Sequence, residues 1–157
     1  MTNELKEAGN TRIVKQLLTG GGLTTLTVLL HAVGSTQWLR LCIANFGDDI
    51  GGIPVFIVPI LLAATALYLF LLHLLEAFLW AATYWWVVPE FRSQPFENAL
   101  YFSLVTFTSL GFGDVVLNRQ WRVLSGTQSV AGLIVNGWTA AFMFTMVSDI
   151  WHAKLLS

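Results

Sequence analysis

Two glycines at alternate positions, Gly111 and Gly113, stand in the segment TSLGFGD at residues 108–114. Glycine adopts positive φ values without a steric penalty, so alternating it with other residues lets successive backbone carbonyls point the same way. Several such strands around one axis would stack rings of carbonyl oxygens that replace the water shell of a cation. Bare backbone at membrane depth is tolerated only where it lines a cavity or is packed in protein. The segment is therefore a candidate cation-binding strand.

Ionisable side chains form a second candidate site. His73 and Glu76 are three residues apart, so they share one face of a helix in a strongly apolar segment. An ionisable pair inside a membrane span is a functional-site candidate by default. The alternatives are pH sensing, a metal site or proton relay, and a buried hydrogen-bonded pair that ties this helix to the short helix before the glycine segment or to His31. His152 and Asp149 repeat the spacing, and there a solvated helix end is favoured over a gate.

The composition sets the class of protein that holds these residues. Of the 157 residues, 55% are hydrophobic and 11% are charged, whereas soluble domains carry about 25% charged residues. So few ionised groups cannot cover a water-facing surface, which excludes a soluble enzyme. Eight Lys and Arg against nine Asp and Glu exclude a nucleic-acid binder, and the single Cys42 excludes an internal disulfide and a multi-cysteine metal site. The sequence predicts a one-domain, all-α integral membrane protein.

Three hydrophobic segments are predicted to form the helices that position these groups. Residues 55–87 form an outer helix and residues 121–152 an inner helix, each longer than the roughly 20 apolar residues that cross a bilayer. Residues 22–44 form the expected first membrane helix, with an interfacial helix as the alternative. A polar tail at residues 1–21 precedes it, and the glycines at 20–22 are interpreted as a flexible break.

Between the outer and inner helices lies an apolar run of about twelve residues, too short to span and therefore predicted to be a re-entrant helix. Residues 97–114 contain this helix and the glycine segment. Pro95 suits the start of the helix, and Glu97 places a negative charge in its first turn. The negative end of the helix dipole would then face the glycine segment, which favours a cation.

From residue 55 onward the chain resembles the pore domain of potassium channels, and it is similar to small bacterial ion-channel-domain proteins with one pore loop. TSLGFGD at 108–114 matches the family pattern TTVGYGD, ALYFS at 99–103 resembles its pore helix, and Gly132 has about the spacing of its hinge glycine. The resemblance implies a pore domain over residues 55–157 and a homotetramer, since one pore loop supplies one of four strands. It implies passive potassium conduction through a filter that ends at Gly113, with K⁺ held at Thr108, Ser109, Leu110, Gly111 and Phe112.

Three filter positions depart from the family pattern. Ser109 replaces threonine but keeps a hydroxyl, Leu110 replaces valine, and Phe112 replaces tyrosine and loses a hydroxyl that could brace the filter. Potassium selectivity is the leading expectation because some eukaryotic potassium channels carry GFG. A weakly selective monovalent cation channel is the alternative. The rival from another class is a membrane enzyme or proton relay, which lacks an HExxH-type motif and would use His31, His73 and Glu76.

Further residues are expected to support the filter and the cavity below it. The resemblance gives Asp114 a bracing hydrogen bond to Tyr101, and the alternative is a solvated charge at the mouth. Asn136 is the one amide in residues 131–147, so it should face the interior, either lining the cavity or bonding to another helix. Its companions at the cavity or gate are Gly132, Leu133, Ala140 and Phe144. Gly132 and Gly137 could be hinges or points of close helix packing.

The charges disagree with a three-span topology. If the pore has the family orientation, three spans place the N-terminus outside the cell, together with Lys6, Arg12 and Lys15. This placement opposes the tendency of basic residues to remain in the cytoplasm. An interfacial first segment would agree with that tendency, whereas the resemblance favours three spans. We expect a multi-pass protein of the cell membrane, the inner membrane in a bacterium, with no enzymatic activity and no cofactor except K⁺ in the filter. The expected partners are lipid, K⁺ and further copies of the chain but not nucleic acid, and the sequence identifies no regulatory partner.

Overall fold

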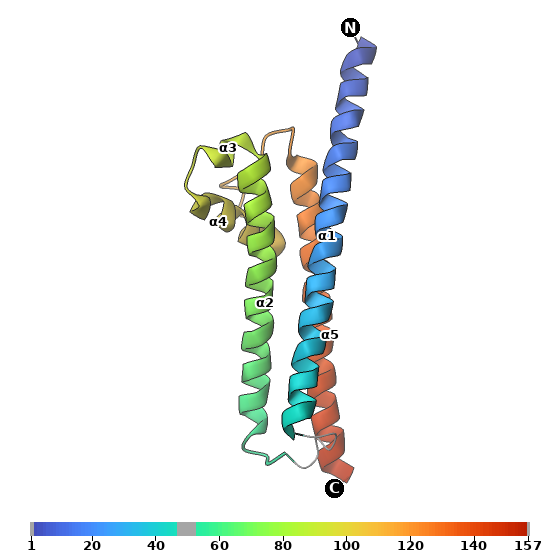
Figure 1. Ribbon diagram of the computed structural model, residues 1–157, viewed down its shortest axis with the longest axis vertical. Coiled ribbons are helices and arrows are strands. Elements are labelled where there is room, and N and C mark those ends of the chain that lie inside the picture. Colours follow the sequence, from blue (N-terminus) through green and yellow to red (C-terminus); the bar gives the residue numbers. More distant parts are fainter. Residues whose placement is uncertain (1, 47–52, 157) are drawn as a thin grey trace.

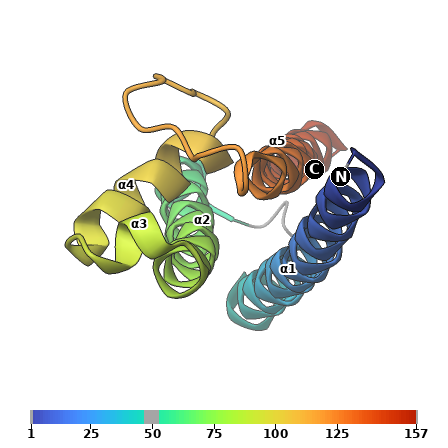
Figure 2. The same ribbon diagram turned by 90° about the horizontal axis from the view of Figure 1, so that it is seen from above.

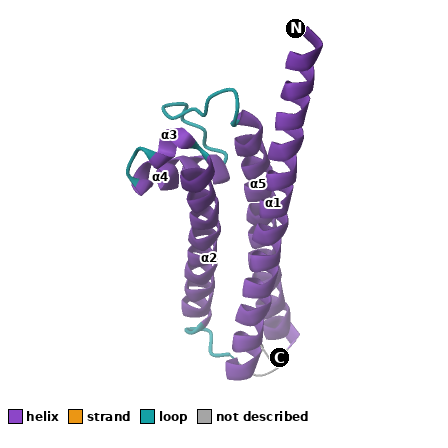
Figure 3. Ribbon diagram, turned by 45° about the horizontal axis from the view of Figure 1, so that its top comes forward, coloured by secondary structure: helices purple, strands orange, loops and turns teal. Residues whose placement is uncertain are grey.

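Three long helices run side by side, and two shorter helices lie beside one end of them (Figure 1). The computed structural model describes residues 2–46 and 53–156, so Met1 and Ser157, at the ends of the predicted ranges 1–21 and 55–157, lie outside the described residues. The described helices are α1 (Thr2–Phe46), α2 (Val58–Val87), α3 (Pro89–Arg92), α4 (Phe96–Phe107) and α5 (Arg122–Leu156). No strand occurs in this part of the chain (Figure 3).

Helices α1, α2 and α5 are each long and apolar enough to cross a membrane, over Gly9–Phe46, Val58–Val87 and Arg122–Leu155. The predicted all-α membrane fold with three hydrophobic segments is therefore confirmed. Helices α1 and α5 run in the same direction, and α2 runs in the opposite one (Figure 1). The start of α1 consequently lies at the end of the molecule that carries α3 and α4, and the end of α5 lies at the other.

Prolines mark the helix boundaries around α4. Val88 ends α2 in an extended conformation, with φ −94° and ψ 112°, as expected for a residue that precedes a proline. Pro89 begins α3, and Pro95 is the N-cap of α4, which has 12 residues and Glu97 in its first turn. Seen from above, α4 and the loop after it lie on the opposite side of α2 and α5 from α1 (Figure 2). The short helix therefore packs on α2 and α5.

The expected break at residues 20–22 is wrong, because α1 is one helix of 45 residues that includes the described part of the predicted polar tail. Glycine inside a helix costs about 1 kcal/mol relative to alanine, but Gly20 has a packing role that offsets this cost. A Cβ atom at Gly20 would overlap the side chain of Thr127 on α5, and a Cβ at Gly34 would lie 2.7 Å from Cδ2 of Leu72 on α2. Small residues let membrane helices approach closely. Both glycines therefore dock α1 on its neighbours, and Gly20 does so within the expected break.

Hydrogen bonds from polar side chains also dock α1 on its neighbours. Buried polar contacts of this kind fix the register of membrane helices, because an unpaired group in the apolar interior is costly. Three of them are spread along α1: Gln16 Oε1 accepts from the backbone N–H of Leu124 (3.2 Å), Thr27 Oγ1 accepts from Trp80 Nε1 (3.0 Å), and Trp38 Nε1 donates to Thr65 Oγ1 (2.9 Å). Helix α1 is therefore part of the same packed unit as α2 and α5.

Candidate ion-conduction site

Helix α4 is held in place by a buried chain of hydrogen bonds. The Tyr84 hydroxyl of α2 donates to Oε1 of Gln128 on α5 at 2.9 Å. Nε2 of Gln128 donates to the Ser103 hydroxyl of α4 at 2.7 Å, and that hydroxyl donates to the carbonyl oxygen of Ala77 at 2.6 Å. The three side chains are fully buried. One amide thus joins α4 to both helices that flank it.

Sequence reasoning missed this chain of hydrogen bonds. The available signal was Gln128 itself, because an amide in an otherwise apolar membrane helix must find a partner. The same helix approaches the C-terminal end of α4 at two further points. The Ser129 hydroxyl donates to the carbonyl oxygen of Thr106 at 3.2 Å. A Cβ atom at Gly132 would overlap the carbonyl oxygen of Phe107.

The segment after α4 has three left-handed residues at alternate positions. The φ values are 58° at Ser109, 55° at Gly111 and 81° at Gly113. Such alternation is the backbone pattern that the two glycines predict for carbonyls facing one way. Ser109 extends it by one step that the glycine pattern did not predict. A residue with a Cβ pays roughly 1–2 kcal/mol in this region, and strain of this kind gathers at functional sites.

The backbone of this segment begins close to the end of α4. The amides of Leu110 and Gly111 both donate to the carbonyl oxygen of Val105, at 3.0 and 3.3 Å. The Thr108 hydroxyl donates back to the carbonyl oxygen of Leu104 at 2.8 Å. Residues 108–114 are all exposed in the isolated chain, including the apolar ring of Phe112.

Tyr101 and Asp114 are brought together as the resemblance implies. The Tyr101 hydroxyl donates to Oδ2 of Asp114 at 2.6 Å, and the backbone N–H of Val115 donates to Oδ1 at 3.0 Å. The hydrogen bond from Tyr101, with a smaller contribution from Val115, holds the pKa of Asp114 below its ordinary value of 3.8. The same bond raises the pKa of Tyr101. The contact links the middle of α4 to the last residue of the glycine segment.

The residues expected at the cavity or gate fall into two groups. Leu133, Asn136, Ala140 and Phe144 are all exposed on α5 in a single subunit. Gly132 is instead buried, and its contact with α4 is the close packing that was the alternative to a hinge. Gly137 is exposed, and nothing lies within 4 Å of a Cβ placed there.

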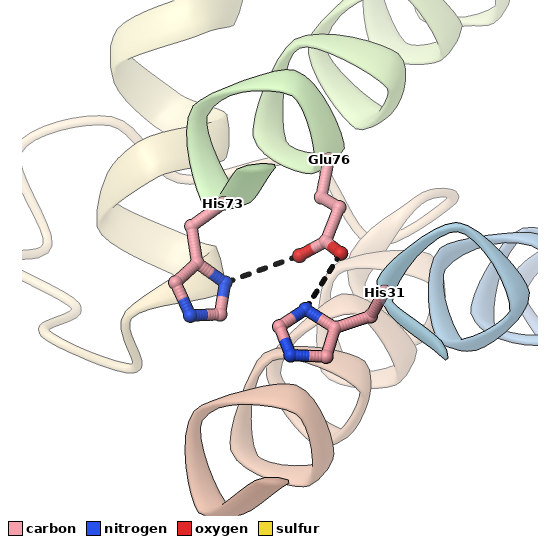
Figure 4. A group of neighbouring side chains, drawn as sticks. All are labelled: His31, His73 and Glu76. Carbon is pink, nitrogen blue, oxygen red and sulfur yellow. Dashed lines mark hydrogen bonds and ion pairs between the residues drawn. The ribbon is translucent and has the colours of Figure 1, made fainter. Parts of the chain in front are cut away.

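The second candidate site is a cluster of His31, His73 and Glu76 between α1 and α2 (Figure 4). Nδ1 of His31 lies 3.0 Å from Oε1 of Glu76, and Nδ1 of His73 lies 3.1 Å from Oε2. Nε2 of each imidazole lies close to the Thr139 hydroxyl of α5, at 2.9 Å for His73 and 3.3 Å for His31. His31 and Glu76 are fully buried. Of the alternatives given for His73 and Glu76, the hydrogen-bonded pair tied to His31 is the arrangement present.

Nitrogen and oxygen atoms of His31, His73 and Glu76 lie within 4.8 Å of one another, near enough to consider a metal ion. Each imidazole nitrogen and each carboxylate oxygen lies within hydrogen-bond distance of a partner in the cluster or of the Thr139 hydroxyl. His152 and Asp149 are not joined to each other. His152 Nδ1 lies 3.1 Å from the carbonyl oxygen of Ser148, and the Asp149 side chain is exposed, as a solvated helix end requires.

Comparison with known proteins gives one match. A family model described as an ion channel matches residues 55–149. This region starts just before α2, includes α4 and the glycine segment, and ends within α5. No curated protein and no solved structure matches the chain. Because the family match covers more than half of the 157 residues and includes the helix, the loop and the left-handed backbone described above, the chain belongs to the ion channel family.

Proposed function

We propose that this protein is the subunit of a passive, potassium-selective channel, and that residues 108–113 are its selectivity filter. The observation that carries the proposal is the alternation of left-handed residues at Ser109, Gly111 and Gly113 directly after α4. Carbonyls that face one way can replace the hydration shell of K⁺ as it passes from ring to ring. The C-terminal end of α4 adds a partial negative charge beside this path. Family membership points to a channel and not to an enzyme.

The proposal includes assembly into a homotetramer in the cell membrane. One chain contributes one filter strand, and a ring of carbonyls needs several copies around an axis. The side of the subunit that carries the filter and the free face of α5 exposes many large apolar residues, namely Leu110, Phe112, Val116, Val130, Leu133, Ile134 and Phe144. A surface of this kind is suited to covering by neighbouring copies and, at its edges, by lipid. Asn136 and Ala140 on the same exposed face would then line the central cavity.

A weakly selective monovalent cation channel is the second candidate, favoured by the side chain at position 112. The resemblance places a tyrosine there, and Phe112 has no hydroxyl with which to brace the filter. The hydrogen bond between Tyr101 and Asp114 supports the selective reading, because it ties the outer end of the segment to α4. The two candidates differ in one measurable quantity, the ratio of potassium flux to sodium flux.

Ion flux into proteoliposomes tests the proposal. We expect uptake driven by a potassium gradient, no comparable uptake with sodium, and block by barium. Gly113→Ala should abolish the flux, because a Cβ is strained at φ 81°. Gly21→Ala is the matched control, since it adds the same methyl group to α1 where nothing lies within 4 Å. Equal potassium and sodium flux would select the second candidate, and flux that survives Gly113→Ala would reject the filter.

A further inference from the structure

Four polar side chains from three helices close a ring of hydrogen bonds below α4. We call His31 of α1, His73 and Glu76 of α2, and Thr139 of α5 the buried ring. Its four contacts are 3.0 Å (His31–Glu76), 3.1 Å (Glu76–His73), 2.9 Å (His73–Thr139) and 3.3 Å (Thr139–His31). The imidazoles of His31 and His73 stack with centroids 5.1 Å apart. Each member has hydrogen-bond contacts with two others, so the protons that these contacts need can be counted.

Two neutral histidines and an ionised Glu76 leave the ring one proton short. An ionised carboxylate only accepts hydrogen bonds, so Glu76 takes the Nδ1–H of both imidazoles. A neutral imidazole with a proton on Nδ1 has only a lone pair on Nε2. Both Nε2 atoms face the single hydroxyl of Thr139, which has one proton to donate. One Nε2 lone pair would then face an oxygen lone pair.

One additional proton completes the ring and also balances its charge. On Glu76, the proton makes a neutral carboxylic acid that donates to Nδ1 of one histidine, whose Nε2–H donates to Thr139. On a histidine, it makes an imidazolium that donates to Glu76 and to Thr139, and the Thr139 hydroxyl donates to the other histidine. The imidazolium and the carboxylate then sum to zero charge, which matters because net charge at membrane depth is costly. A divalent metal in the same place would leave the ring with a net positive charge and displace its hydrogen bonds. The proton fits both requirements.

Other charges near the ring do not change this balance. Helix α2 carries no Asp, Glu, Lys, Arg or His besides His73 and Glu76. Trp138 of α5 and Phe107 of α4 contribute only aromatic rings, each 5.9 Å from an imidazole centroid. On the other helices, the nearest charged residues lie nine or more positions, roughly 13 Å or more along the helix, from His31, Phe107 or Thr139. They are Lys15 and Arg40 on α1, Glu97 on α4, and Arg122 and Asp149 on α5.

We propose that the buried ring is a binding site for one exchangeable proton, and that this proton locks α1 onto α2 and α5 beneath the filter. His73 is the only imidazole of the ring with an exposed fraction, 17%, so the proton enters and leaves through it. The His73 ring also lies 5.9 Å from that of Phe107, the last residue of α4. Loss of the proton removes one ring contact and leaves a net negative charge. The consequence for ion flux rests on the proposed function, whereas proton binding does not.

Nitrogen-15 spectroscopy of histidine-labelled, full-length protein in lipid nanodiscs tests proton binding directly. The chain has three histidines, and the exposed His152 serves as an internal reference. We expect the two imidazoles and the Glu76 carboxyl to carry three protons between them at neutral pH, and carbon-13 labelling of Glu76 measures the share held by the carboxyl. They should lose one of the three as the pH rises. Only two such protons at every pH at which the protein stays folded would overturn the proposal, as would a tightly bound divalent metal found by elemental analysis.

Glu76→Gln is the decisive variant because it keeps the ring but removes the need for the extra proton. The glutamine amide donates to one Nδ1 and accepts from the other, so two neutral imidazoles and Thr139 complete all four contacts. We expect the two imidazoles of this variant to carry two nitrogen-bound protons at every pH while the protein remains folded. Trp38→Phe is the matched control, since it removes a contact between α1 and α2, the one with Thr65, that has no titratable group. Retention of the third proton in Glu76→Gln would contradict the assignment.

The coupling to the pore is measured by potassium flux against pH. We expect the wild-type flux to change over the pH range in which the ring loses its proton, and the flux of Glu76→Gln to be flat there. Trp38→Phe should keep the wild-type profile. A ring that titrates without any change in flux would overturn the coupling and leave the proton site intact. If no variant conducts, the proposed function fails, and the nitrogen-15 spectra still decide whether the proton is bound.

Discussion

The Tyr101 hydroxyl lies 2.6 Å from Oδ2 of Asp114, so a residue in the middle of α4 is bonded to the residue that follows the filter segment. The two residues are thirteen positions apart, and the segment between them contains all three left-handed residues. The bond therefore closes a loop around the part of the backbone that carries the proposed conduction. Its strength should be visible in the titration of Asp114.

Tyr101→Phe should raise the pKa of Asp114 toward its ordinary value of 3.8, because the hydrogen bond from Tyr101 is the main cause of its depression. A depressed pKa means that the folded protein favours the carboxylate. The contribution of the bond to stability is therefore present above pH 3.8 and is lost as the pH falls through the lowered pKa. Carbon-13 titration of Asp114 in both proteins measures the shift. Identical titrations would show that the bond does not form in the assembled protein.

Gln128→Leu should destabilise the protein by about 1–3 kcal/mol, because it leaves the buried hydroxyl of Tyr84 without its acceptor. It also removes the donor to Ser103 and so loosens α4. Thermal unfolding in detergent measures the loss, and flux should fall with it. Gln37→Leu is the control, since Gln37 is exposed on α1. Equal stability of the two variants would mean that the buried amide is dispensable.

Gly132→Ala should displace α4, because the added Cβ would overlap the carbonyl oxygen of Phe107. Overpacking of this kind costs about 1–3 kcal/mol. Gly137→Ala on the same helix meets nothing within 4 Å and should be neutral or slightly stabilising. The unfolding temperatures and ion fluxes of the two variants distinguish a packing role of Gly132 from a hinge role. A hinge at Gly132 predicts normal stability with altered gating, and that pattern would contradict the packing reading.

Ser109 offers a paired test of its backbone and its hydroxyl. Ser109→Ala removes only the hydroxyl, whereas Ser109→Gly also removes the Cβ that is strained at φ 58°. The glycine variant should be more stable than the alanine variant by about 1 kcal/mol. A difference in the ratio of potassium to sodium flux between the wild type and Ser109→Ala would show that the hydroxyl contributes to selectivity. If glycine is no more stable than alanine, the residue is not left-handed in the assembled channel.

Much of this architecture was accessible from local chemistry. Hydrophobic segments of sufficient length predict α2 and α5, and Pro95, Glu97 and the alternating glycines predict a short helix followed by an unusual backbone. These signals are local, because each depends on the conformational limits of a residue or on the cost of placing it in lipid. The ion channel family follows from the same residues.

What could not be predicted depends on which helix faces which. Gly20 reads as a helix breaker until Thr127 is found against it, more than 100 residues later in the chain. Gln128 reads as one more polar residue until Tyr84 and Ser103 are placed on either side. His31 was a candidate partner for Glu76, but Thr139 gave no sign of joining them, since threonine is common in membrane helices. Pairings between distant residues leave no periodic trace in a single sequence.

The buried ring can form only late in the synthesis of the chain. His31 and Glu76 are 45 residues apart and can meet once the first two helices have been made, but Thr139 follows His31 by 108 residues. The ring cannot close until α5 has left the ribosome and entered the bilayer. Until then, His31, His73 and Glu76 of the α1–α2 hairpin lack the hydroxyl of Thr139 as a hydrogen-bond partner. Arrival of the last helix therefore completes a polar contact deep in the bilayer, and a chain truncated before α5 would keep that contact open.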